Sequence, residues 1–217
     1  MNNLKTVFAA ATFAAVTATA SSALAVTYDF GADASSGPSA SLNFTIGAGI
    51  TAVASARTID ATGTDTGTAK VGLYHDTRPN EGGLGVTAPG DTNHEIDGGS
   101  SIGLRDMLLL TFNQKVKIVK ASFSRVDNKF DGDDAFITFD GTRIDTDGLI
   151  DLAVSFPNFL PIGVEGTVIG FGALFSNDDY KLRSITVTPI PLPPAALLLL
   201  SGMAGMGVLA RRRRKQS

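Results

Sequence analysis

The sequence contains no cysteine and no tryptophan, and it has only two histidines. Without cysteine there is no disulfide, thiol nucleophile or cysteine-ligated metal, so stability must come from the hydrophobic core or from bound ions. The histidines, His75 and His94, form neither an H-E-x-x-H motif nor a closely spaced pair. We therefore expect a protein that is not an enzyme. A hydrolase that uses two facing carboxylates is the catalytic alternative.

Positive charge is scarce in the central part of the chain. Residues 26–188 contain all 21 acidic residues but only 12 of the 18 lysines and arginines, which gives this part a net charge of −9. Nucleic-acid-binding domains carry a basic surface, so we expect no nucleic-acid partner. An acidic balance fits a soluble outer-surface protein or one that attracts divalent cations.

The N-terminal segment has the three parts of a secretory signal peptide. Lys5 supplies the positive charge, residues 7–20 are apolar and rich in alanine, and Ala23-Leu24-Ala25 is an A-x-A cleavage site. Cleavage at Ala23 and Ala25 would make Val26 the mature N-terminus. We expect residues 1–25 to be removed and the protein to be exported through the Sec pathway, with an uncleaved anchor as the alternative.

The last 29 residues, 189–217, form a second targeting segment. A proline cluster precedes the apolar residues 194–210, and a basic tail follows them. A membrane helix needs roughly 20 apolar residues, so 194–210 is a short transmembrane helix. The tail has too many cations to translocate, and we expect this end to stay cytoplasmic. Its basic cluster comprises Arg211, Arg212, Arg213, Arg214 and Lys215.

The proline cluster contains Pro191, Leu192 and Pro193, with Ile190 before them and Pro194 and two alanines after them. A short proline motif, a membrane helix and a terminal arginine cluster together resemble the PEP-CTERM class of bacterial sorting signals. The motif is similar to the VPLPA variant, from which it departs by isoleucine in place of valine and by the additional Pro194. The resemblance covers the C-terminal sorting segment only.

This resemblance implies that an exosortase-like membrane transpeptidase recognises the segment and removes the helix and the basic tail. The protein would be tethered to the inner membrane and then reach the cell surface or the extracellular space. The class is associated with exopolysaccharide and biofilm, which implies a cell-envelope or matrix role with extracellular polysaccharide as a candidate partner. A plain C-terminal membrane anchor is the alternative.

Residues 26–188 have the pattern of a single all-β domain. Period-2 alternation predicts short strands, and 32–41 and 75–103 are expected to be loops. Strands at this spacing predict an antiparallel sandwich or jelly roll, and pairing of the last strand with an early one would close the domain beside the membrane segment. The expected strands are 26–30, 42–46, 50–59, 70–74, 105–112, 116–126, 135–139, 149–156, 164–175 and 180–187, with turns at Asn113-Gln114 and Asp140-Gly141. Residues 164–175 are expected to form either one long strand or a pair of strands.

Two acidic clusters are candidate calcium sites, because calcium binds six to eight carboxylate, carbonyl and water oxygens. The first contains Asp127, Asp131, Asp133 and Asp134, and it is not an EF-hand, since Lys129 and Thr138 occupy ligand positions. The second contains Asp91 and Asp97, with Asn93 and Glu95 at alternate positions between them. Solvated acidic turns, with no cofactor, are the alternative, and Asp178 and Asp179 are expected to cap the last turn.

The sequence predicts delivery better than it predicts activity. The main interpretation is a non-enzymatic, exported surface or matrix protein sorted through its C-terminal segment. The alternative is a calcium-assisted carbohydrate-binding module. Sugar-binding platforms use exposed aromatic side chains, but tryptophan is absent and most phenylalanines fall at core positions, so such a module would bind through polar loops.

Overall fold

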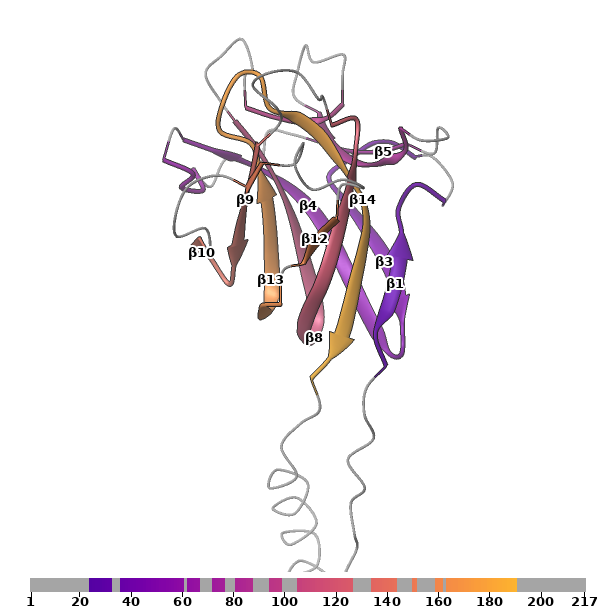
Figure 1. The fold of residues 1–217 in the computed structure, drawn as a ribbon. Coiled ribbons are helices and arrows are strands. Elements are labelled where there is room, and N and C mark those ends of the chain that lie inside the picture. The colour runs from indigo at the N-terminus through magenta and orange to yellow at the C-terminus, as the bar shows by residue number, and fades with distance from the viewer. Residues whose placement is uncertain are drawn as a thin grey trace, which may run out of the picture. The chain divides into compact units, whose positions relative to one another are not determined.

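A computed structural model describes the parts of the chain that form one compact unit, Ala23–Ile190. In these parts every regular element is a strand and every strand pair is antiparallel, which confirms the all-β antiparallel class (Figure 1). They include no helix long and apolar enough to cross a membrane. The described residues are 24–32, 36–60, 62–66, 72–76, 81–87, 94–98, 105–126, 134–143, 150–151, 159–161 and 163–190.

The described residues contain 14 strands, and most of them lie where the alternation predicts them. Residues 50–59 form one strand with the expected bounds, whereas both expected loops contain strands, since β2 lies in the first and β6 and β7 in the second. The strands are β1 Val26–Asp29, β2 Ser36–Ser39, β3 Ser41–Gly47, β4 Ile50–Ile59, β5 Gly72–Asp76, β6 Gly83–Thr87, β7 Ile96–Asp97, β8 Arg105–Ser124, β9 Asp134–Phe139, β10 Thr142–Arg143, β11 Ile150–Asp151, β12 Phe159–Pro161, β13 Glu165–Gly172 and β14 Asp179–Pro189.

The long strand β8 organises the sheet. The prediction of two strands separated by a turn at Asn113-Gln114 is wrong, because the backbone stays extended through these residues. What changes there is the neighbouring strand: Arg105–Phe112 pairs with β4, whereas Val116–Ser124 pairs with β14. The β8–β13 register also shifts at this place, and such irregularities bend a strand.

The two halves of β8 enclose one core. Met107, near the beginning of β8, pairs with Gly172 of β13, and Ser124, at its end, pairs with Lys181 of β14. The Tyr180 hydroxyl donates a hydrogen bond of 2.9 Å to the Gly172 carbonyl, so the two ends of β8 come together. Side chains from both halves therefore meet in a single interior.

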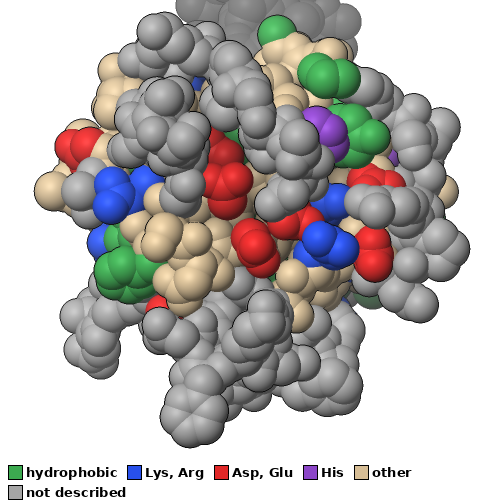
Figure 2. Space-filling model, turned by 90° about the horizontal axis from the view of Figure 1, so that it is seen from above, with side chains coloured by type: hydrophobic (Ala, Val, Ile, Leu, Met, Phe, Trp, Pro, Cys, Tyr) green, Lys and Arg blue, Asp and Glu red, His purple; other side chains and the backbone are tan. Residues whose placement is uncertain are grey.

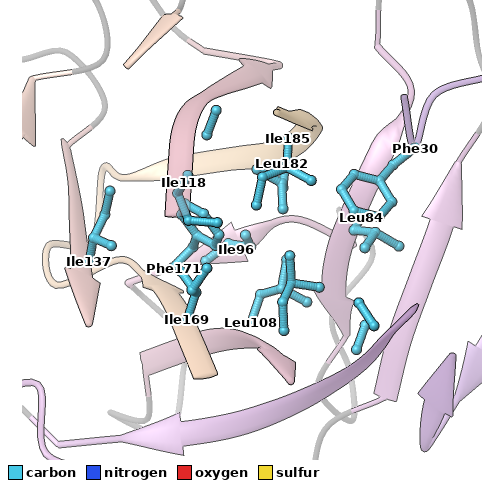
Figure 3. Close-up of a cluster of buried hydrophobic side chains, with 14 of the residues drawn as sticks. Phe30, Leu84, Ile96, Leu108, Ile118, Ile137, Ile169, Phe171, Leu182 and Ile185 are labelled. Atoms are coloured by element: carbon cyan, nitrogen blue, oxygen red, sulfur yellow. The ribbon is translucent and has the colours of Figure 1, made fainter. Parts of the chain in front are cut away.

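Figure 3 shows this main core. Side chains from both halves of β8 and from the strands beside them point into the same space, and all of those in the following list are fully buried: Leu108, Ile118, Ile169, Phe171, Leu182 and Ile185. A smaller cluster of Ile59, Met107, Phe136 and Leu174 lies apart from the main core. Alternation assigns these two sets to opposite faces, since Met107 is followed by Leu108 on β8.

The first and last described strands pair with each other. Val26 of β1 lies opposite Val187 of β14, and Asp29 lies opposite Ser184. This confirms the expected pairing of the last strand with an early one. The residue before β1, Ala25, and the residue after β14, Ile190, therefore lie at the same end of the domain (Figure 1).

Two turns show how polar residues fix this fold. Asp140 and Gly141 have φ angles of 46° and 81° between β9 and β10, which confirms the predicted hairpin turn and explains the glycine. Asn113 faces outward from β8 and holds the β3–β4 turn. Its Oδ1 accepts a hydrogen bond from the Thr51 amide and its Nδ2 donates one to the Gly49 carbonyl, both at 3.0 Å.

Two valines of β8 test the assigned alternation. Val116 is fully buried and Val119 is 38% exposed. Val116→Ala should lower the free energy of unfolding of residues 26–190 by about 2 kcal/mol, since two buried methyl-sized groups are lost and a cavity remains. Val119→Ala is the matched control and should cost less than about 0.5 kcal/mol in the same urea titration. Equal losses would contradict the assigned register.

Candidate functional site

Charged side chains gather at the end of the domain where β14 begins, opposite to the end where β1 begins. Figure 2 looks onto this end and shows acidic side chains near its centre, with lysine, arginine and histidine side chains beside them. Two of the predicted calcium ligands belong here, Asp97 in β7 and Asp134 at the start of β9. This end is therefore the natural candidate for a functional site.

The buried carboxylate of Asp178 holds three segments together. Its Oδ1 accepts a hydrogen bond of 3.1 Å from the Asp134 amide, and its Oδ2 accepts bonds from the amides of Leu174 and Phe175 at 3.1 and 2.8 Å. Its own carbonyl accepts a 3.2 Å bond from the Gly98 amide. Asp178 thus joins the start of β9, the β13–β14 turn and the residues after β7, which confirms its expected role as a turn cap.

One residue of each predicted calcium cluster lies at this turn. Asp134, of the first cluster, is hydrogen-bonded to Asp178, and Asp97, of the second, pairs with Asp179 across β7 and β14. Among the described residues, however, no three acidic or histidine side chains form a group that could hold a metal ion. Four predicted ligands, Asp91, Asp127, Asp131 and Asp133, lie outside the described residues. Calcium binding stays a prediction from the sequence.

Glu95 and Arg125 form an ion pair beside this turn. Arg125 Nε lies 2.6 Å from Glu95 Oε1, and Arg125 Nη1 lies 3.4 Å from Glu81 Oε2. Burial of the Glu95 carboxyl raises its pKa, and the hydrogen bond and positive charge of Arg125 oppose that rise. Arg125 has a φ of 65°, a left-handed backbone conformation that is uncommon for this residue.

A second ion pair lies deeper. The Nζ of Lys181 is 3.0 Å from Asp76 Oδ2, and the two side chains are 0% and 7% exposed. Burial removes both charges from water, and the attraction between them offsets part of the desolvation cost of each. This pair fixes β14 against β5. The sequence does not predict it, since the partners are 105 positions apart.

Each histidine has a structural partner. The His94 ring stacks on Tyr74, with 4.2 Å between the ring centroids, and its Nδ1 lies 3.0 Å from Thr87 Oγ1. The His75 ring nitrogen Nε2 is hydrogen-bonded to the carbonyl oxygen of Phe30. These contacts, like the ion pairs, hold the segments at this end in place.

Most of the predicted targeting residues lie outside the part of the chain that the structure describes. Of the predicted signal-peptide cleavage residues the structure describes Ala25, directly before β1, whereas Ala23 lies outside the described residues. The sorting motif Pro191, Leu192 and Pro193 and the basic cluster 211–215 also lie outside them.

No protein-family profile, curated protein or solved structure matches this chain. Its function is therefore inferred from its own residues and geometry.

The ion pair of Lys181 gives a stability prediction. Lys181→Ala should lower the free energy of unfolding of residues 26–190 by about 3–5 kcal/mol, because it removes the Lys181 cation from beside the buried Asp76 carboxylate. Lys115→Ala is the control, since Lys115 and its partner Glu165 are both exposed at 3.5 Å, and it should cost less than about 1 kcal/mol. Chemical denaturation measures both, and a small loss for Lys181→Ala would contradict the buried pair.

The raised pKa of Glu95 predicts how stability depends on pH. A carboxyl whose pKa is higher in the folded state binds its proton more tightly there, so its contribution to stability is lost as pH rises through the folded pKa. The stability of the wild type relative to Glu95→Gln should therefore fall as pH rises from about 4 through that raised value, and then become constant. Denaturation of both proteins across this range measures the difference, and a rise with pH would contradict the assignment.

Proposed function

We propose that this chain is a non-enzymatic protein of the bacterial cell surface or extracellular matrix, delivered by its two terminal segments. The N-terminal segment directs Sec export and is removed after Ala25. The C-terminal segment holds the protein in the inner membrane with its basic end in the cytoplasm. An exosortase-like transpeptidase then removes the helix and the basic tail.

The pairing of β1 with β14 carries this proposal. It brings Ala25 and Ile190 to one end of the domain, so signal-peptide cleavage and C-terminal processing would act on the same side of the fold. The other end of the domain carries the charged side chains (Figure 2). This arrangement suits a folded domain that is first tethered and then released.

A two-layer arrangement of the sandwich or jelly-roll type is part of the proposal. It is supported by β8, which pairs with β4 along its first half and with β14 along its second, around one core. Strands that change layers at a bend are typical of such folds. The absence of cysteine leaves this core to stabilise the exported domain.

Mass spectrometry of the mature protein from its native host tests the sorting step. We expect an N-terminus at Val26 and the loss of residues beyond the Pro191–Pro193 region. Replacing Arg211–Arg214 and Lys215 by serine should remove the topology signal and leave the C-terminus unprocessed. Replacing Lys115 and Lys117, two exposed lysines of β8, is the matched control for lost charge and should leave processing unchanged.

An intact basic C-terminus in the mature wild-type protein would contradict processing and leave a plain membrane anchor. An N-terminus at Met1 would contradict signal-peptide cleavage. These two outcomes are independent, because in this proposal a signal peptidase cleaves the N-terminal segment and a transpeptidase cleaves the C-terminal segment.

A further inference from the structure

A cavity of about 470 Å³ opens on the outer face of the sheet, away from the main core. Its floor is formed by Met107 and Leu109 of β8, Val168 of β13 and Thr138 of β9. The volume is within the range of small-molecule sites, about 300–1,000 Å³. The sequence made none of these residues a candidate for a binding site, because they come from three strands.

Glycine makes this floor continuous. A Cβ atom on Gly170 of β13 would lie 2.4 Å from Thr138 Oγ1 and 3.0 Å from both Leu109 Cδ2 and Met107 Sδ. A Cβ atom at 2.4 Å would force Thr138 to move, and one at 3.0 Å would press on Leu109 and Met107, so glycine allows these side chains to meet over β13. The result is a surface of aliphatic and thioether groups with one hydroxyl among them.

A turn pinned by Asp60 makes one wall of the cavity. The Asp60 Oδ1 accepts hydrogen bonds from the Thr62 amide, the Thr62 hydroxyl and the Thr64 amide at 2.8, 2.6 and 3.0 Å, and these bonds lower the pKa of the carboxyl. The turn presents Thr64 and Asp65 to the cavity.

The β9–β10 hairpin makes the other wall and is pinned in the same way. The Asp140 Oδ1 accepts bonds from the Thr167 amide and hydroxyl, both 2.9 Å, and from the Val168 amide at 2.8 Å. The hairpin presents Arg143, whose guanidinium lies 5.3 Å from the centre of the Phe136 ring. Both walls are thus formed before any ligand arrives.

The lining selects the chemistry of the occupant. The floor favours an apolar face, whereas the threonine hydroxyls, the Asp65 carboxylate and the Arg143 guanidinium favour a ligand with hydroxyl groups around its edge. A purely apolar ligand would displace the water bound to these polar groups without forming hydrogen bonds in its place, which is unfavourable. The strands of the floor, β8, β13 and β9, are each paired on both sides here, so within the described residues the floor itself offers no open strand edge to an extended peptide.

A sugar ring combines an apolar C–H face with a hydroxyl edge. Asp65 is also paired with Arg57, whose Nε lies 3.7 Å from Asp65 Oδ2, and the domain as a whole carries −9, which disfavours an acidic glycan. We propose that this cavity binds a short neutral oligosaccharide. The proposal does not depend on calcium or on C-terminal sorting.

Met107 provides a direct reporter. It is the one methionine among the described residues, and its side chain lies on the floor of the cavity. The full chain, carrying ¹³C-methyl methionine in a detergent without a sugar headgroup, would be titrated with cellotriose, maltotriose, mannotriose and xylotriose. Met107→Leu assigns the signal. We expect at least one trisaccharide to shift it saturably.

Thr138→Val and Arg143→Met should each weaken that binding about tenfold, because each removes hydrogen-bonding groups from the lining while keeping its apolar part. Lys117→Met removes an exposed cation from the same chain outside the cavity and should leave the affinity unchanged.

Three results would overturn the proposal. The first is an unmoved Met107 signal with all four sugars at about 10 mM, where a site with a Kd of about 1 mM would be filled. The second is tighter binding of trigalacturonate, which would assign an acidic ligand. The third is an equal loss of affinity in Lys117→Met. None of these results bears on whether the C-terminus is processed.

Discussion

The fold depends on β8, whose side chains alternate between two faces up to Ile118 and again from Ala121, with a register shift at Val119 between the two stretches. Alternation puts Leu108 and Leu110 into the main core and Met107 and Leu109 onto the opposite face. Because the same strand pairs with β4, β13, β12 and β14, a slip of one residue would exchange core and surface in four neighbours at once. With no disulfide to hold it, the register of this one strand determines the rest of the domain.

The sequence predicts those parts of the fold that depend on residues close together in the chain. Local patterns sufficed for β4, whose alternation runs from Ile50 to Ile59, and for the Asp140-Gly141 turn, whose residue types suit positive φ. The expected turn at Asn113-Gln114 failed because polar residues can also occupy an extended strand. The alternation of Phe112 and Val116 across them was the better signal.

The candidate sites were less predictable, because their partners are distant in sequence. Asp178 was recognisable as a turn cap, but its bond to the Asp134 amide joins residues 44 positions apart. Lys181 appears as one charge among alternating residues, and only the fold brings Asp76 to it. The lining of the outer cavity was not predictable at all, since Met107, Thr138 and Arg143 have no common motif.

The two ends and the outer face of the domain have different physical roles. The end with Ala25 and Ile190 connects to the two terminal segments that we propose to be targeting signals, and the opposite end is fixed by ion pairs and by the Asp178 carboxylate. Exchanging a whole buried pair such as Lys181–Asp76 for apolar residues often costs little stability, whereas removing one partner alone is costly. The outer cavity differs from both ends, because Asp60 and Asp140 fix its walls and its lining includes Asp65 and Arg143. If the domain is delivered as proposed, its side-facing cavity would be presented both before and after release from the membrane.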